Sequence, residues 1–239
     1  MTQQSQSTPP AQSNLMKSLI LPGIRNFVIG VIVLGVILSL LAGSFSYWRG
    51  WVLTVLFALL TTSQGIYLGI KDPELLKRRT QVAPEGESMA ERIFIVVGLV
   101  GTFAMFVVAA LDRRFGWSKM PVWVSVLGDA LLLFSFYLYY LVLKENSYAA
   151  TSIKTFEGQK VISTGLYGIV RHPKYVGDLF LGISIPLALG SWWALVLIAL
   201  TIAGLVWRIL DEEKLLMKDL PGYIEYTQKV HYRLVPYLW

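Results

Sequence analysis

Residues 175–210 read YVGDLFLGISIPLALGSWWALVLIALTIAGLVWRIL, two apolar runs separated only by Gly190-Ser191. An α-helix needs about 20 apolar residues to cross a bilayer. The first run, Tyr175–Leu189, is short for a full crossing, whereas the second, Trp192–Leu210, is almost long enough. Because glycine and serine favour turns, we expect the two runs to form a tight helical hairpin.

Four further apolar runs precede this hairpin, at about Phe27–Leu41, Trp51–Ile70, Ile93–Leu111 and Val122–Leu143. No alternation of apolar and polar residues favours strands. The sequence therefore predicts an all-α integral membrane protein with five to six transmembrane helices. We divide it into a disordered or interfacial tail (residues 1–23), a four-helix transmembrane region (residues 24–143) and a C-terminal region with the hairpin (residues 144–239).

The composition excludes several classes of protein. With 55% hydrophobic and only 15% charged residues, the chain is too apolar for an ordinary soluble domain of its length. The absence of cysteine excludes disulfides and thiolate metal sites. Only two histidines are present, which makes a histidine-rich metal centre unexpected. We therefore expect no metal.

The net charge of +6 is explained by lysine and arginine in loops on one side of a membrane. If six segments cross and the N-terminus is cytoplasmic, only four of the 21 basic residues lie outside: Arg49, Arg113, Arg114 and Lys119. This bias predicts that both termini are cytoplasmic, and it removes the need for a nucleic-acid partner. The compact length and the lack of eukaryotic retention signals favour a prokaryotic inner membrane.

A polar stretch stands directly at the start of the hairpin: residues 164–178 read TGLYGIVRHPKYVGD. Polar and ring-bearing side chains beside lipid indicate a site, since lipid offers them no partners. Pro173 disfavours helix at His172 and favours a helix that begins just after it. His172 is then at the helix mouth, where free N–H groups suit an anion. The simpler alternative is an interfacial helix cap.

A second polar cluster, Trp207–Glu213, follows the hairpin. Arg208 and Glu212 are spaced i, i+4 and so share one helix face. Alone, they could be an ion pair where a helix leaves the bilayer. Because the hairpin returns the chain to the same side, however, the two clusters should lie together. They would form a cytoplasmic pocket at the lipid boundary, suited to a polar cofactor and a lipidic substrate.

The polar residues of this region form a longer pattern. It comprises Gly165-x-Tyr167, Arg171-His172-Pro173-x-Tyr175-x-Gly177, Arg208-x-x-x-Glu212-Glu213, Tyr223-x-x-Tyr226 and Val235-Pro236. Over residues 146–239 it resembles the isoprenylcysteine carboxyl methyltransferase family. Leu166 stands where many members have proline, and Gly168 replaces a larger or basic residue, which bears on loop shape.

The resemblance implies an integral membrane methyltransferase that uses S-adenosylmethionine and releases S-adenosylhomocysteine. It implies that ten residues bind the cofactor: Gln159, Lys160, Val161, Ile162, Tyr167, His172, Pro173, Lys174, Tyr175 and Glu212. Arg208 would face the substrate, and Arg208 and Glu212 would carry catalysis. The expected acceptor is the carboxylate of a lipophilic, prenylcysteine-like molecule, with a phospholipid amine and a small thiol as open alternatives.

Two competing interpretations remain at this stage. Residues 176–179 and 230–237 are similar to pieces of membrane sterol reductases, which use NADPH, although the chain is short for their larger bundle. A non-catalytic transporter or assembly factor would instead place charged residues inside the spans. Only Asp129 fits that description.

Overall fold

The computed structural model describes residues 10–80, 89–149, 155 and 158–239. The helices are α1 (Pro10–Leu41), α2 (Trp48–Lys71), α3 (Pro73–Thr80), α4 (Met89–Phe115), α5 (Val122–Glu145), the 3-10 turn η1 (Gly165–Gly168), α6 (Pro173–Leu189), α7 (Trp192–Val196), α8 (Ile198–Asp219) and α9 (Tyr223–Lys229). No strand occurs within these described ranges. The all-α class predicted from the sequence is confirmed.

Among the residues that the structure describes, five helical stretches are long and apolar enough to cross a membrane. They are Pro22–Leu41, Trp48–Lys71, Arg92–Phe115, Val122–Glu145 and Trp192–Asp219. Helix α6 has 17 residues. Its length of about 25 Å falls short of the ~30 Å hydrocarbon core. The prediction of five to six spans with a short fifth arm is therefore confirmed.

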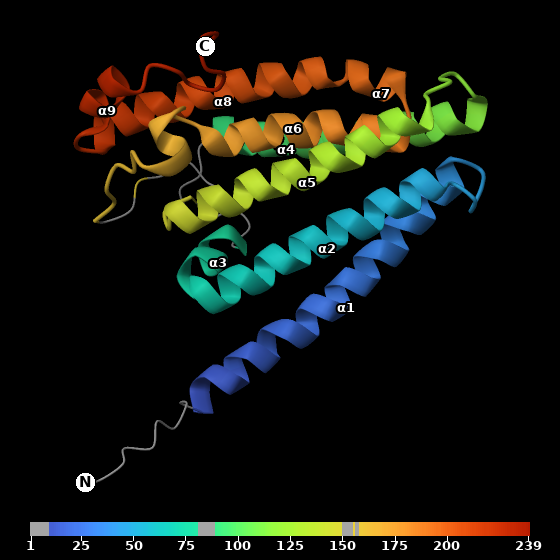
Figure 1. Cartoon of the computed structure of the whole chain (residues 1–239), viewed down its shortest axis with the longest axis horizontal. Coiled ribbons are helices and arrows are strands. Elements are labelled where there is room, and N and C mark those ends of the chain that lie inside the picture. The colour runs from blue at the N-terminus through green and yellow to red at the C-terminus, as the bar shows by residue number, and fades with distance from the viewer. Residues whose placement is uncertain (1–9, 81–88, 150–154, 156–157) are drawn as a thin grey trace.

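The long helices run side by side, except that α1 diverges from α2 toward its N-terminus (Figure 1). The end of α5, the turn η1, the start of α6, the end of α8 and helix α9 all lie at one end of the bundle (Figure 1). Residues 164–178 and the C-terminal segment are thus brought together, as the hairpin topology predicted.

Helix α6 is held tightly against α5. A Cβ atom added to Gly128 of α5 would lie 2.3 Å from the backbone nitrogen of Ala188, so the two backbones touch there. Nearer the polar end, Gly177 packs against the Tyr139 ring and its carbonyl accepts a 2.9 Å hydrogen bond from Ser135 Oγ. Small residues permit such close packing in membranes, and this packing fixes where α6 begins.

The hairpin turn forms as the sequence predicted. Gly190 has φ +80°, the left-handed conformation that commonly ends a helix and that glycine adopts without strain. Ser191 Oγ then accepts a hydrogen bond from the Ala194 amide and caps α7. The chain returns through α7 and α8 to the end from which α6 started (Figure 1).

The two segments not yet described are the N-terminal part of α1 and the short helix α3. Helix α1 begins at Pro10, so helix extends into residues expected to form the tail, while residues 1–9 lie outside the described part of the chain. The short helix α3 follows α2 directly. The three-part division of the chain stays a prediction.

Candidate functional site

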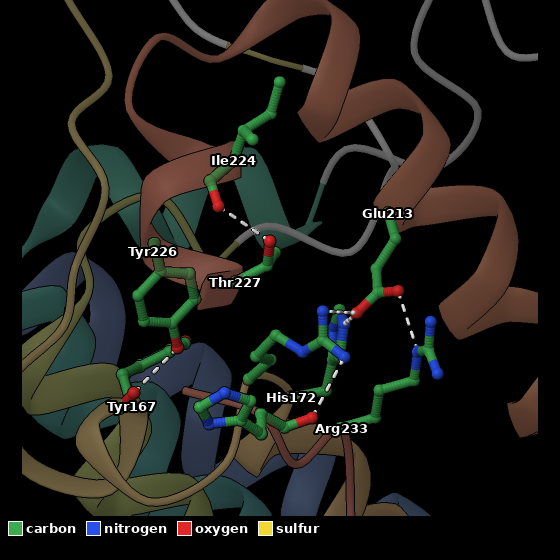
Figure 2. Close-up of polar contacts among 9 residues, drawn as sticks. Tyr167, His172, Glu213, Ile224, Tyr226, Thr227 and Arg233 are labelled. Carbon is green, nitrogen blue, oxygen red and sulfur yellow. Dashed lines mark hydrogen bonds and ion pairs between the residues drawn. The ribbon is translucent and has the colours of Figure 1, made fainter. Parts of the chain in front are cut away.

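The turn η1 presents Tyr167 from a fixed loop. Gly165 has φ +56°, which favours glycine at the start of the turn. The Tyr167 hydroxyl accepts a 2.9 Å hydrogen bond from Asn146 Nδ2. The backbone carbonyl of Tyr167 accepts a 2.7 Å hydrogen bond from the Tyr226 hydroxyl (Figure 2). Burial raises the pKa of Tyr167 to about 12, so the phenol stays neutral at physiological pH.

His172 stands just before Pro173, the first residue of α6, as the sequence predicted. The backbone N–H of Arg171 donates to the Tyr232 carbonyl (2.9 Å), and that of His172 donates to the Arg233 carbonyl (3.0 Å). Since proline has no N–H and the His172 amide is occupied, this helix start offers fewer donors to an anion than the sequence suggested. The pairing ties the C-terminal segment to the motif.

Next to this pairing, one buried carboxylate contacts three basic side chains. Glu213 of α8 is 2% exposed. Its Oε1 lies 3.1 Å from Arg171 Nη1 and 3.3 Å from His172 Nε2, and its Oε2 accepts a 2.8 Å hydrogen bond from Arg233 Nε. Figure 2 shows the Glu213 carboxylate pointing toward His172 and Arg233. Glu213 therefore links α6, α8 and the C-terminal segment, a role the sequence-based site did not include.

The predicted pair Arg208 and Glu212 meets at a third residue. The Tyr175 hydroxyl donates a 2.5 Å hydrogen bond to Glu212 Oε2 and accepts one of 3.4 Å from Arg208 Nε. The Arg208 guanidinium lies 5.0 Å from the centre of the Phe94 ring of α4. Arg208 is only 4% exposed, so its charge is held in one place at the end of the bundle.

These groups line one pocket at this end of the bundle. Its lining includes all ten residues predicted to bind cofactor, together with Arg208. The structure thus brings the predicted site residues together, while their individual roles stay predictions. The rest of the lining is Asn146, Tyr148, Ala149, Arg171, Leu216, Leu220, Tyr223 and Tyr226.

Two buried polar atoms of this pocket have no hydrogen-bond partner among the described residues: Tyr223 Oη and Arg171 Nε. Since buried polar groups are nearly always paired, these atoms indicate room for a polar ligand. Burial raises the pKa of Tyr223 well above its usual value, so its hydroxyl remains a donor. Within the described residues, no group of three or more His, Asp or Glu side chains is placed to hold a metal ion.

Comparison with known proteins identifies a related region. The model of the phospholipid methyltransferase family matches residues 123–221, a range that contains the motif 164–178 and the pair Arg208 and Glu212. The mouse Delta(14)-sterol reductase TM7SF2 is 34% identical over 91 residues, 37% of this chain and 22% of the reductase. The Delta(14)-sterol reductase of Methylotuvimicrobium alcaliphilum is 33% identical over 95 residues, 38% of this chain and 22% of that enzyme.

The whole fold is similar to a solved structure of the eukaryotic intramembrane Ras methyltransferase ICMT (isoprenylcysteine carboxyl methyltransferase). The TM-score is 0.53, and the match covers 97% of this chain and 99% of the other at 15% sequence identity. At that identity the likeness establishes the fold alone. Together with the family match, it confirms the resemblance predicted from the sequence. By contrast, this chain spans about a fifth of the length of each reductase.

Proposed function

We propose that this chain, with its phospholipid methyltransferase region and ICMT-like fold, is an integral membrane methyltransferase that uses S-adenosylmethionine. The observation that carries the proposal is the single pocket in which all the predicted cofactor residues and Arg208 meet at one end of the spans. The pocket lies at the end of the candidate spans, where lipid and water would meet, so a water-borne cofactor and a membrane-borne acceptor could reach it from different sides.

The residues present suit the cofactor. Tyr167 and Tyr175 line the pocket, and the ring face of a tyrosine can stabilise a cation by about 0.5–2 kcal/mol. Lys174 Nζ, held by a 2.9 Å ion pair to Asp178, places a positive charge in the lining, and the Arg171 and Tyr223 atoms noted above supply further donors. When bound, the cofactor supplies an activated methyl group on a sulfonium.

We propose that the acceptor is a carboxylate on a lipophilic molecule of the prenylcysteine type. Arg208 is the reason: a buried, fixed guanidinium at the lipid boundary binds a carboxylate through two parallel hydrogen bonds. A carboxylate is already ionised at neutral pH, so the protein has no proton to move. The residues need only bind, orient and exclude water, and orientation alone can supply about 7–11 kcal/mol.

We further propose that the pocket faces the cytoplasm of a prokaryotic cell. The support is the distribution of lysine and arginine along the sequence, since only Arg49, Arg113, Arg114 and Lys119 fall in segments predicted to lie on the opposite side.

The experiment is a binding comparison followed by a transfer assay. Detergent-solubilised protein is titrated by calorimetry with S-adenosylmethionine and, separately, with NADPH. We expect binding of the first and none of the second. Transfer of labelled methyl to farnesylcysteine and to lipid extracts then identifies the acceptor. Binding of NADPH alone would overturn the proposal in favour of a reductase, the alternative raised by the partial sequence matches.

A further inference from the structure

A second polar cavity lies at the end of the bundle opposite the proposed cofactor pocket. Here the α1–α2, α4–α5 and α6–α7 turns come together (Figure 1). They enclose a cavity of about 330 Å³, which falls at the small end of the range of roughly 300–1,000 Å³ typical of ligand sites. Its lining is Tyr47, Trp48, Arg49, Asp112, Arg113, Gly116, Ser118, Lys119, Met120, Leu189 and Gly190.

Asp112 is the one acid in that lining, and its carboxylate accepts hydrogen bonds from three neutral donors. One oxygen accepts from the Ser118 amide (2.6 Å), and the other accepts from the Ser118 hydroxyl (2.6 Å) and the Ser191 hydroxyl (2.5 Å). Asp112 is 1% exposed. It therefore joins the α4–α5 and α6–α7 turns, and its single negative charge offsets only one of the three positive charges in the lining.

Three basic side chains line the same cavity: Arg49, Arg113 and Lys119. None of them forms an ion pair with any acid in the described part of the chain. Arg49 Nη2 donates to the Met120 carbonyl (2.9 Å), while its Nε is buried and has no partner among the described residues. With three bases and one acid, the cavity thus has a net positive charge and an unused buried donor.

The position of the cavity relative to the bilayer follows from the tryptophans. Five exposed indole side chains cluster around the three turns: Trp48, Trp117, Trp123, Trp192 and Trp193. Tryptophan in membrane proteins concentrates at the level of the lipid headgroups. The cations of the cavity are therefore at the depth where lipid phosphates lie.

We propose that this distal cavity binds the phosphate of an anionic membrane lipid. Arginine pairs with phosphate through charge-assisted hydrogen bonds, and the cations of the cavity lie at the depth of the lipid phosphates. Arg49 also packs directly on Gly190, the residue that turns α6 into α7. A bound phosphate would therefore fasten the closed end of the hairpin whose open end carries His172 and Arg208.

The test measures lipid binding and needs no methyl transfer, so it is independent of the proposed function. Full-length protein in an uncharged detergent is heated with increasing phosphatidylglycerol, phosphatidylcholine or inorganic phosphate, and the shift in Tm gives an apparent affinity. The variants are Arg113→Gln and Lys119→Gln. Arg114→Gln is the matched control, because Arg114 is the next exposed residue on the same helix and does not line the cavity.

We expect phosphatidylglycerol to stabilise the wild type and Arg114→Gln alike, with an apparent affinity about tenfold weaker in Arg113→Gln and Lys119→Gln, since each loses a charged hydrogen bond. Phosphatidylcholine and inorganic phosphate should give little stabilisation. Equal shifts in Tm with phosphatidylglycerol in all three variants would contradict the proposed binding site. Phosphatidylcholine or free phosphate acting as strongly as phosphatidylglycerol would overturn its assignment to an anionic lipid.

Discussion

The Tyr175 hydroxyl lies 2.5 Å from Glu212 Oε2, which joins the start of α6 to the end of α8 within the candidate pocket. The same hydroxyl accepts from Arg208 Nε, so one phenol contacts both the predicted cofactor-binding acid and the predicted substrate-binding base. Tyr175 therefore connects the predicted cofactor site to the predicted acceptor site.

Replacing Tyr175 with phenylalanine should affect both cofactor binding and methyl transfer. A lost hydrogen bond to a charged group is worth about 1.5–3 kcal/mol, so we expect Tyr175→Phe to weaken S-adenosylmethionine binding roughly tenfold and to lower kcat as well. Calorimetry and methyl-transfer kinetics measure the two effects. Tyr237→Phe, at a side chain that is 91% exposed, should behave as wild type. Unchanged cofactor affinity in Tyr175→Phe would argue against Glu212 as a cofactor ligand.

Arg208→Ala should separate binding of the two substrates. If Arg208 positions the acceptor carboxylate, its loss lowers kcat/KM for the acceptor by about a hundredfold, through a charged bidentate contact of roughly 3 kcal/mol. Cofactor affinity should stay within about twofold in the same titration. Lys214→Ala, an exposed cation on the same helix, serves as the control. A large loss of cofactor affinity in Arg208→Ala would instead indicate that Arg208 binds the cofactor.

Glu213→Ala should destabilise the protein more than it affects any single ligand. Removing one partner of a buried ion pair costs about 3–5 kcal/mol, because the remaining charges stay buried. Arg171 and His172 are both less than 10% exposed and would lose their shared carboxylate. Thermal unfolding in detergent should show a clear fall in Tm, with almost none for the exposed Asp219→Asn. Equal Tm values would contradict the role assigned to Glu213.

Gly128→Ala should disrupt the contact between α5 and α6. The new methyl group would lie 2.3 Å from the Ala188 nitrogen, and relieving such a clash through backbone shifts costs about 1–3 kcal/mol. Gly98→Ala on α4 is the control, since a Cβ there meets no atom within 4 Å. We expect a lower Tm for the first variant and an unchanged or slightly higher one for the second.

The local signals predicted the elements of this fold well. Gly190-Ser191 between two apolar runs gave the hairpin, and Pro173 gave the start of α6. The i, i+4 spacing of Arg208 and Glu212 correctly placed both in one pocket. Each of these patterns depends only on neighbouring residues, which is why sequence alone suffices for them.

Contacts between distant segments could not be predicted in the same way. The amides of Arg171 and His172 bond to carbonyls about 60 positions later, and no local pattern encodes that pairing. Glu213 was visible beside Glu212, but only the direction of its side chain reveals its three basic partners. Tyr223 and Tyr226 likewise belonged to a recognised spacing, yet their place in the pocket depends on how α9 folds back.

The backbone contact between Gly128 and Ala188 has a mechanical consequence. With no side chain between them, α5 and α6 cannot slide or separate without losing contact along the pair, so they should move as one rigid body. Any opening that admits a membrane-borne acceptor must then come from the other wall of the pocket, formed by α8 and α9. We expect amide hydrogen exchange to be slow along α6 and faster at the α8–α9 junction.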